Sequence, residues 1–306
     1  MLHRLLLAGL MLLGAIGQAS AADLAKTMTV DGLQRSYLVH VPANLPQDRA
    51  AALVLVLHGG GGNAATTARQ THFDDQADRA GFIVVYPNGT DRARPLLNAL
   101  GKPGLLTWNA GACCGYAVEH RTDDVAFIRA LVGQLERDYR IDPARVYATG
   151  LSNGGMMAYR LACEASDIFA AIGPVSAVEI APACNPTQPV SVIHFHGTAD
   201  QNVPMQGGIG DKALVKQARP PVQASIDFWV RHDGCNAQPD ASQNGKVTLL
   251  DYRGCAQGSE VAFYVIEGGG HAWPGGDRIA AFLDAPSQDI NATAVMWQFF
   301  ADHPRR

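Results

Sequence analysis

The sequence predicts an α/β fold with a mostly parallel central sheet and helices on both of its faces. Strand-like and helix-like segments alternate along the chain, as expected of repeated strand–helix–strand units. Several strands are continuous apolar runs of the kind buried on both faces, such as AALVLVL at Ala51–Leu57. With 306 residues, of which 47% are hydrophobic and 17% charged, the chain can bury one large core.

The expected elements follow in chain order. The first strand is Leu33–Val41, whose alternating pattern is typical of an amphipathic strand, and the second is Ala51–Leu57. Further apolar runs predict strands at residues 81–87, 145–149, 169–175, 190–196 and 261–267. Helical patterns lie between them at residues 67–80, 124–137, 155–163, Val222–His232 and 288–300. The Gly- and Pro-rich region 88–121 is expected to form a long loop or a small excursion, and no repeat, linker or break in composition divides the chain.

The N-terminal segment is expected to be a cleaved secretory signal. It has a basic start at His3 and Arg4, an apolar run over residues 5–16 and the small-x-small sequence at residues 19–21. A membrane anchor is the alternative, but the run is interrupted well before the roughly 20 apolar residues that a span requires. We predict a signal peptide at 1–21, a single folded domain at 22–306, secretion to a periplasm or the extracellular space, and no stable membrane insertion after cleavage.

The charge balance argues against nucleic acid as a partner. The chain has 24 Lys and Arg residues against 28 Asp and Glu residues, a formal net charge of −4. It contains no basic run and no basic helix stripe. A nucleic acid or an anionic membrane surface is therefore not an expected partner.

The cysteines are expected to form disulfides, because their number is even in a chain bound for an oxidising compartment. Loop length and position favour Cys163 with Cys184 and Cys235 with Cys255. The neighbours Cys113 and Cys114 can close only as a vicinal disulfide, or else stay reduced. A zinc site is the competing interpretation, but the spacings lack paired C-x-x-C motifs, so no metal is expected.

A candidate nucleophile lies between a predicted strand and a predicted helix. The residues Gly150-Leu151-Ser152-Asn153-Gly154 match G-x-S-x-G in the strand–turn–helix context that a nucleophile elbow requires. Side chains at Gly150 or Gly154 would collide with neighbouring backbone in so sharp a turn. The alternative is a glycine-rich turn with an incidental N-cap serine. The context favours Ser152 as a nucleophile.

A serine nucleophile needs a base and a carboxylate that orients the base. In this architecture the chain order is serine, acid, histidine, with the acid after a late strand. Asp200 follows the strand at 190–196 and fits this position. Asp123 and Asp124 precede the serine and are typical of a helix start, while Asp277 comes after the candidate base, which breaks the order.

The candidate base is His271, in the loop EGGGHAWPGG after the last predicted strand. His194 and His196 lie within a strand, where hydrogen-bonded structural histidines are the commoner outcome. His58, beside a run of glycines, is expected to brace that loop rather than act as a base. The other histidines carry no motif and are interpreted as surface or packing residues.

The glycine run after Ala51–Leu57 is a candidate oxyanion hole. LVLHGGGGNA places four glycines directly after a buried strand, as in loops that offer a backbone N–H to a developing oxyanion. We assign the N–H of Gly60, with Gly61 as second choice, and the N–H of Asn153 at the start of the nucleophile helix. A phosphate-binding loop is the alternative, but neither G-K-[ST] nor G-x-G-x-x-G with a following acid is present.

Taken together these motifs resemble the secreted esterase family that holds polyhydroxybutyrate depolymerases and the feruloyl and acetylxylan esterases of plant biomass. The resemblance runs from about residue 33 to 300 and includes LHGGGGNA, TWNAGACCG, TDDVAF, GLSNGGMMAYRLAC, HFHGTADQNVP and GGGHAWPGG. It implies an α/β-hydrolase fold, a triad of Ser152, Asp200 and His271, and no cofactor. The all-glycine loop after His58 departs from the family, in which many members carry a bulkier residue there.

The sequence says less about the substrate. Trp108 and Trp273 are candidates for an aromatic wall that binds a feruloyl ring or a sugar face, with burial in a loop core as the alternative. The chain ends soon after its last predicted helix with no Thr- or Pro-rich linker to a polymer-binding module. Soluble or oligomeric esters, such as feruloyl or acetyl esters of plant polysaccharide fragments, are therefore favoured over solid polyester.

Two classes of function are compatible with these residues. The favoured one is a secreted serine carboxylester hydrolase that works through an acyl-enzyme, with a polyhydroxybutyrate oligomer depolymerase as the alternative substrate class. The other is a non-catalytic carbohydrate- or lipid-binding protein on a hydrolase scaffold. The presence of all three triad residue types and of both glycine motifs disfavours it. A peptidase on the same fold is a third option, although no added lid or propeller domain for peptides is visible.

Overall fold

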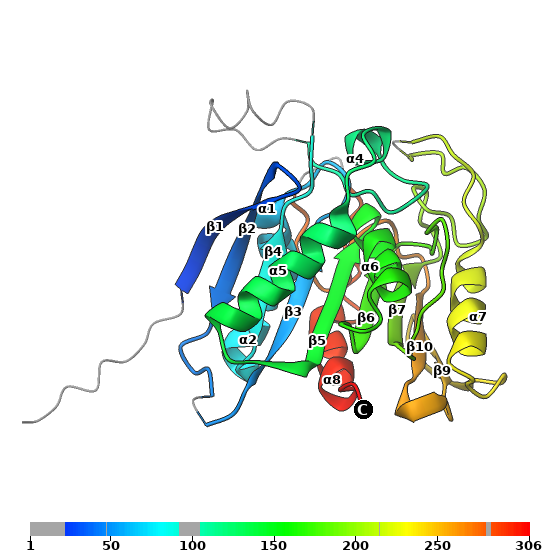
Figure 1. Cartoon of the computed structure of the whole chain (residues 1–306). Helices are drawn as coiled ribbons and strands as arrows, with labels where there is room; N and C mark the ends of the chain where they lie inside the picture. Colours follow the sequence, from blue (N-terminus) through cyan, green and yellow to red (C-terminus); the bar gives the residue numbers. More distant parts are fainter. Residues whose placement is uncertain (1–21, 47, 92–104, 214, 280–282) are drawn as a thin grey trace, which may run out of the picture.

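The computed structural model describes residues 22–46, 48–91, 105–213, 215–279 and 283–306. Within these residues one ten-stranded sheet runs through the molecule in the order β1-β2-β4-β3-β5-β6-β7-β10-β9-β8 (Figure 1). Its strands are β1 (Ala22–Val30), β2 (Leu33–Val41), β3 (Ala51–Leu57), β4 (Ile83–Pro87), β5 (Ile141–Leu151), β6 (Ala171–Val175), β7 (Ser191–Gly197), β8 (Asp240–Asn244), β9 (Val247–Tyr252) and β10 (Val261–Ile266). The six central strands pair in parallel, and two antiparallel strands extend the sheet on each side. The predicted α/β class is confirmed.

Helices cover both faces of the sheet, and the alternation of side chains along β3 explains why. Leu53, Leu55 and Leu57 pack in one core cluster, while Ala52, Val54 and Val56 pack in the other. The first face is covered by α5 (Asp124–Asp138), α6 (Asn153–Glu164) and α7 (Val222–His232), with the short α4 (Gly115–Glu119) in the loop before α5. The second face is covered by α1 (Ala64–Thr71), α2 (Phe73–Ala80) and α8 (Ala292–Asp302). None of the helices in the described residues is long and apolar enough to cross a membrane.

Two helix predictions were wrong in their bounds, for local reasons. The helix expected at 67–80 is two helices, because His72 adopts a left-handed φ of 54° between α1 and α2. Asn63 starts α1 earlier, since its side chain accepts the backbone N–H of Thr66. The last helix begins at Ala292 rather than at residue 288, because Asn291 caps it through the N–H of Ala294.

Three strands were not predicted, and two of them form the outer edges of the sheet. β1 is an edge strand paired only with β2, and β8 is an edge strand whose five residues are all exposed. Neither needs an apolar pattern, so neither gives a sequence signal. β9 joins β8 through a tight turn at Gly245, whose φ is 57°. Much of the Gly- and Pro-rich region 88–121 lies outside the described residues; its described part contains the Thr90–Thr107 bridge and α4.

The six cysteines are paired in three disulfides. Cys163 with Cys184 and Cys235 with Cys255 are joined as their spacing predicted. Cys113 and Cys114, which the sequence left open, form a vicinal disulfide across a cis peptide bond. No free thiol is left.

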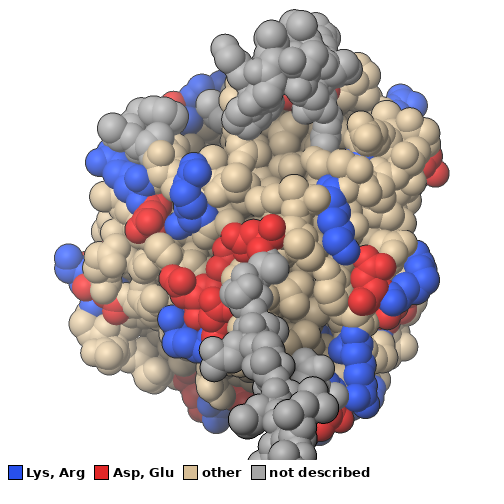
Figure 2. Space-filling model, turned by 90° about the vertical axis from the view of Figure 1, so that its left-hand side faces the viewer, with Lys and Arg blue, Asp and Glu red and all other residues tan. Residues whose placement is uncertain are grey.

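The edge strand β1 is held by a buried histidine among carboxylates. His40 on β2 contacts Asp23 on β1 at 2.6 Å and Asp78 on α2 at 3.0 Å, with Asp74 at 4.0 Å. Figure 2 shows the side of the molecule on which β1 lies, where acidic side chains gather near the middle of the face. Burial lowers the pKa of His40, but the hydrogen bonds to Asp23 and Asp78 and the charge of Asp74 outweigh it, so the pKa is raised.

We expect the stability that His40 contributes to fall as the pH rises. Because the folded-state pKa lies above the unfolded value of about 6.5, the contribution is complete below pH 6.5 and is lost as the pH rises through the folded pKa. Thermal unfolding of the protein and of His40→Gln at pH 6 and pH 9 measures the effect. The difference between the two proteins should be under about 1 kcal/mol and larger at pH 6. A difference that is equal at the two pH values would contradict this.

Candidate active site

Ser152 sits on a sharp turn between β5 and α6, as the motif predicts. Its φ of 57° and ψ of −121° lie in a region that residues other than glycine rarely adopt. The backbone is anchored on both sides, because the Ser152 N–H donates to Val175 O on β6 and its carbonyl accepts the Met156 N–H in α6. The strand, the turn and the helix therefore present the serine at the carboxyl end of β5.

The glycines of the motif are required by close backbone contact. A Cβ on Gly150 would lie 2.7 Å from Leu57 O, and one on Gly154 would lie 2.6 Å from His58 O. A Cβ on Gly155 would lie 2.7 Å from the Cβ of Ala177. The start of α6 can approach the end of β3 and the loop after β6 only because these positions carry no side chain.

Asp200 and His271 are brought together by adjacent parallel strands. Asp200 follows β7, His271 follows β10, and the His271 Nδ1–H donates to Asp200 Oδ2 at 2.8 Å. The other carboxylate oxygen accepts the backbone N–H groups of Asn202 at 2.8 Å and Val203 at 2.9 Å. Burial raises the pKa of Asp200, but the hydrogen bond and charge of His271, with smaller contributions from His196 and Val203, lower it overall. Asp200 is therefore ionised where it meets the imidazole.

Ser152 lies at the same edge of the sheet as this pair. β5, β6, β7 and β10 are consecutive parallel neighbours, so the loops that follow them share one edge, the upper one in Figure 1. Within the described residues no hydrogen bond joins the Ser152 hydroxyl to His271. The structure thus pairs the candidate acid with the candidate base, and the strand order brings Ser152 to the same edge.

A carboxylate that the sequence did not single out holds the histidine loop. Asp284 Oδ2 accepts the backbone N–H of His271 at 2.8 Å, and its other oxygen pairs with Lys212 Nζ at 3.0 Å. The His271 N–H bond is the main reason that the pKa of Asp284 is lowered. No motif marks this residue, because the contact is set by the path of the loop and not by a local pattern.

The glycine loop after β3 lies against the start of α6. A Cβ on Gly60 would lie 3.7 Å from the Asn153 Cβ, so the two predicted oxyanion donors are neighbours. The Gly61 N–H is already used, since it donates to Leu106 O at 2.8 Å. The backbone N–H groups of Gly60 and Asn153 make no hydrogen bond to another described residue. This favours Gly60 over Gly61.

His58 braces the glycine loop, as expected. Its Nδ1 bonds to Gly59 O at 2.8 Å, and its Nε2 accepts the Gly89 N–H at 2.9 Å. The side chain is buried, and both ring nitrogens make these contacts. His58 therefore links the glycine loop to the end of β4.

Trp108 and Trp273 are buried, so the predicted aromatic wall finds no support in this arrangement. Their exposed fractions are 0% and 1%, and their indole N–H groups donate to His58 O and to Thr293 Oγ1. Asn153 clamps the backbone of Trp108 through both atoms of its amide, at 2.7 and 3.0 Å. Trp108 is therefore part of the frame that fixes the start of α6.

A buried ion pair also holds the loop that contains Trp108. Arg35 Nη2 donates to Asp124 Oδ1 at 2.7 Å, and both side chains are almost completely buried. Asp124 Oδ2 accepts the Asn109 N–H at 2.7 Å, next to Trp108. Asp123, not Asp124, caps α5, through the N–H of Ala126. The expected helix start is confirmed, and Asp124 also positions the Trp108 loop.

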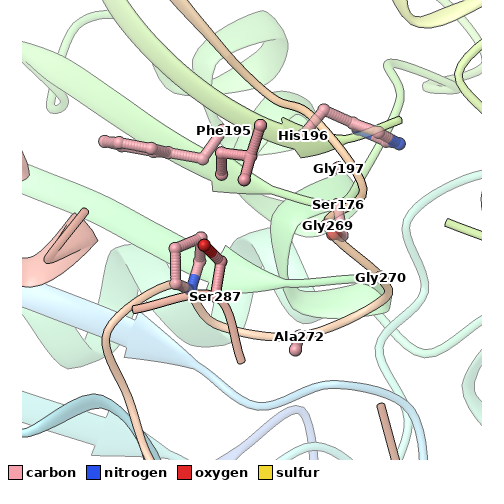
Figure 3. A pocket seen from close by; sticks show the side chains of 10 residues that line it. Ser176, Phe195, His196, Gly197, Gly269, Gly270, Ala272 and Ser287 are labelled. Atoms are coloured by element: carbon pink, nitrogen blue, oxygen red, sulfur yellow. The ribbon is translucent and has the colours of Figure 1, made fainter. Parts of the chain in front are cut away.

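A small pocket lies beside the acid–base pair rather than on it. It is lined by residues at the ends of β6, β7 and β10 and by the loops that flank His271, among them Ser176, His196, Gly269 and Ser287 (Figure 3). Neither Ser152, Asp200 nor His271 lines it. The pocket therefore borders the site without defining where a substrate lies.

Known proteins resemble this chain in sequence and in fold. A sequence profile described as esterase PHB depolymerase matches residues 35–213. "Putative esterase NocK" of Nocardia uniformis subsp. tsuyamanensis is 32% identical over 84% of this chain and 76% of its own length. "Feruloyl esterase B" of Piromyces equi is 30% identical over 78% of this chain, which spans only 42% of that protein. The acetyl xylan esterase from Aspergillus awamori has the same fold, with a TM-score of 0.62 at 16% identity over 91% of this chain and 99% of that one.

Proposed function

The chain belongs to the esterase PHB depolymerase family and is a carboxylic ester hydrolase, and from this premise we propose that Ser152, His271 and Asp200 are its catalytic triad. The observation that carries the proposal is the 2.8 Å hydrogen bond from His271 Nδ1 to the buried carboxylate of Asp200. That bond leaves Nε2 of the imidazole as the atom that can take a proton. Ser152, on its strained turn at the same edge, is the proposed source of that proton.

The proposed reaction passes through an acyl-enzyme. The Ser152 Oγ attacks the ester carbonyl carbon while His271 Nε2 takes the hydroxyl proton, and the ionised Asp200 stabilises the imidazolium that results. His271 then returns the proton to the leaving alcohol. A water molecule then attacks the acyl carbon while His271 takes one of its protons. His271 returns that proton to Ser152 Oγ as the acyl–oxygen bond breaks and the free acid leaves. Apart from the ester and water, the chain supplies every group in these steps from its own side chains and backbone, and no cofactor is proposed.

The oxyanion formed in each step is proposed to accept the backbone N–H groups of Gly60 and Asn153. Their neighbouring positions, and the use of the Gly61 N–H by Leu106, support this choice. Asn153 also begins α6, so the positive end of the helix dipole faces the developing charge. The clamp between the Asn153 amide and Trp108 would keep this N–H in place during the reaction.

For the substrate, we propose feruloyl or acetyl esters of plant polysaccharide fragments, with polyhydroxybutyrate oligomers as the second candidate. The names of the relatives, feruloyl esterases and a bifunctional acetylxylan esterase/xylanase among them, support the first class. The description of the matching family supports the second. A hydrolysis panel of methyl ferulate, acetylated xylan and 3-hydroxybutyrate oligomers separates them. Ferulate or acetate release without oligomer cleavage supports the first class, and the reverse result overturns it.

We also propose that residues 1–21 are a cleaved signal and that residues 22–306 form one exported catalytic domain. Residues 1–21 lie outside the described residues, and β1 begins at Ala22. The three disulfides support an oxidising compartment, because such bonds rarely persist in the cytosol. N-terminal sequencing of the exported protein should begin at or near Ala22; retention of residues 1–21 would refute the cleavage.

Removing the Asp284 carboxylate should slow catalysis without blocking substrate binding. We expect Asp284→Ala to lower kcat about tenfold, or about 1.4 kcal/mol, with KM changed less, because the backbone of His271 loses its acceptor. Steady-state kinetics on p-nitrophenyl butyrate measure both constants. Asp277→Ala is the matched control, since Asp277 is an exposed carboxylate that pairs with His72 instead. Equal effects of the two substitutions would contradict the prediction.

A further inference from the structure

A chain of buried hydrogen bonds connects the nucleophile helix to the acid loop. Tyr159 on α6 bonds to His194 Nδ1 at 2.8 Å, and His194 Nε2 bonds to His196 Nδ1 at 3.2 Å. His196 Nε2 then bonds to Val203 O at 2.8 Å, in the turn that contains Asp200. Tyr159, His194 and His196 are each 1% exposed or less. The proposed catalytic steps do not use these three side chains.

The carbonyl of Val203 at one end fixes the direction of every hydrogen bond in the chain. A carbonyl oxygen only accepts, so His196 Nε2 must carry a hydrogen and, in a neutral ring, its Nδ1 accepts. His194 Nε2–H then donates to His196, and His194 Nδ1 accepts the Tyr159 O–H. Burial lowers the pKa of both histidines, and burial raises the pKa of Tyr159, so all three groups stay neutral. We refer to Tyr159, His194 and His196 as the relay.

The relay ends on the turn that orients the catalytic acid. Val203 is held on both sides, since its carbonyl accepts from His196 and its N–H donates to Asp200 Oδ1 at 2.9 Å. His196 Nε2 also lies 3.6 Å from Asp200 Oδ2, the oxygen that binds His271. In Figure 3 the His196 ring projects from the opposite side of β7 to the Phe195 ring, away from the core cluster that contains Phe195. In the other tautomer of His196, a lone pair on Nε2 would face Val203 O and Asp200 Oδ2 and repel both oxygens.

We propose that the relay residues are positioning residues for the ester hydrolysis, which hold the Asp200 turn against the nucleophile helix through the N–H that His196 donates to Val203 O. This rests on the proposed triad, because the relay acts through Asp200 on His271. Other ionisable groups that act on the relay are Glu179 near Tyr159, and Asp200 and His271 near His196. From β10 the apolar ring of Phe263 packs edge-on against His194. If the relay only satisfied buried polar groups, it would stabilise the fold but would not affect how Asp200 orients His271.

Kinetics of Tyr159→Phe test the proposal. The substitution removes the O–H that donates to His194 Nδ1, so the hydrogen-bonded chain no longer joins α6 to the Asp200 turn and the turn is held less firmly. We expect kcat to fall about tenfold with KM within about twofold, which corresponds to about 1.4 kcal/mol in the barrier. With a weaker Asp200–His271 interaction the imidazolium is less stabilised, so the acid limb of the kcat/KM profile should move to lower pH. An unchanged kcat with an unchanged acid limb would overturn the proposal.

Tyr147→Phe is the matched control for a buried tyrosine. Tyr147 lies on β5, is fully buried and stacks on Phe300, and its hydroxyl makes no hydrogen bond within the described residues. We expect its kcat and pH profile to match those of the unchanged protein. If kcat fell equally in Tyr147→Phe and Tyr159→Phe, the loss would come from removing any buried hydroxyl and not from the relay. That result would also overturn the proposal.

A spectroscopic test does not depend on catalysis or on a folded variant. Long-range ¹H–¹⁵N NMR of the unchanged protein labelled with ¹⁵N-histidine reports the tautomer of each ring. We expect His194 and His196 to be neutral with hydrogen on Nε2 from pH 6 to 8, and a charged ring or hydrogen on Nδ1 would refute the relay. If Ser152→Ala kept its activity, the triad would fail while this spectrum stayed as expected, so the two failures are distinguishable.

Discussion

Ser152→Ala is expected to abolish ester hydrolysis, with kcat lower by a factor of about 10⁴ to 10⁶. The substitution removes the only atom proposed to form a covalent bond with the acyl group. The Asp200–His271 pair would remain intact, but the proposed nucleophile that it activates would be gone. The protein should remain folded, because Ser152 Oγ makes no hydrogen bond within the described residues. Hydrolysis of p-nitrophenyl butyrate measures the loss, and labelling by a fluorophosphonate should disappear with it.

Ser176→Ala is the matched control for this substitution. Ser176 directly follows the neighbouring strand β6 with a φ of 49°, so alanine meets a positive φ at both positions. It lines the small pocket beside the site and has no proposed role in the reaction. We expect Ser176→Ala to retain most of the activity and to keep its fluorophosphonate labelling. A Ser152→Ala protein that still hydrolyses the ester would overturn the triad.

The central fold could be predicted because segments that pack against the core carry their own signal. Leu33–Val41, Ala51–Leu57 and Val222–His232 have the bounds that were predicted. Their apolar patterns reflect the side chains that each segment must bury in the core, whichever neighbouring element it packs against. The edge strands β1 and β8 face solvent on at least one side and need no such pattern, so their pairing is decided by neighbours distant in sequence.

The same distinction explains which parts of the site were visible in the sequence. The serine turn requires glycines at fixed spacing, and the acid and base follow strands whose order the topology imposes. The groups that hold them have no fixed spacing. Asp284 reaches His271 across a loop, and Arg35 reaches Asp124 over 89 positions of the chain. His196 was expected to be structural because it lies in a strand. Its place in a hydrogen-bonded chain that runs from Tyr159 to the Asp200 turn becomes visible only in the folded structure.

The glycines of the elbow are the part of the site where a single methyl group should have the largest effect on stability. We expect Gly154→Ala to lower the free energy of unfolding by about 3 kcal/mol or more, because its Cβ would overlap Leu57 O and lie 2.6 Å from His58 O. Both atoms are backbone at the end of β3, so neither can swing aside as a side chain would. The midpoint of thermal unfolding should fall by about 6 to 12 °C. Activity should fall as well, because the displacement separates Asn153 from Gly60.

Gly133→Ala shows whether this loss comes from the contact or from the type of substitution. Gly133 lies within α5, and a Cβ there would meet only the flexible end of Arg137 at 3.7 Å. Since alanine favours a helix over glycine, this substitution should stabilise the protein by about 0.5 to 1 kcal/mol. The two variants make the same chemical change in two helices and should move the unfolding midpoint in opposite directions. A Gly154→Ala protein as stable as the unchanged one would mean that β3 and α6 are farther apart than the elbow requires, and the placement of both oxyanion donors would then be wrong.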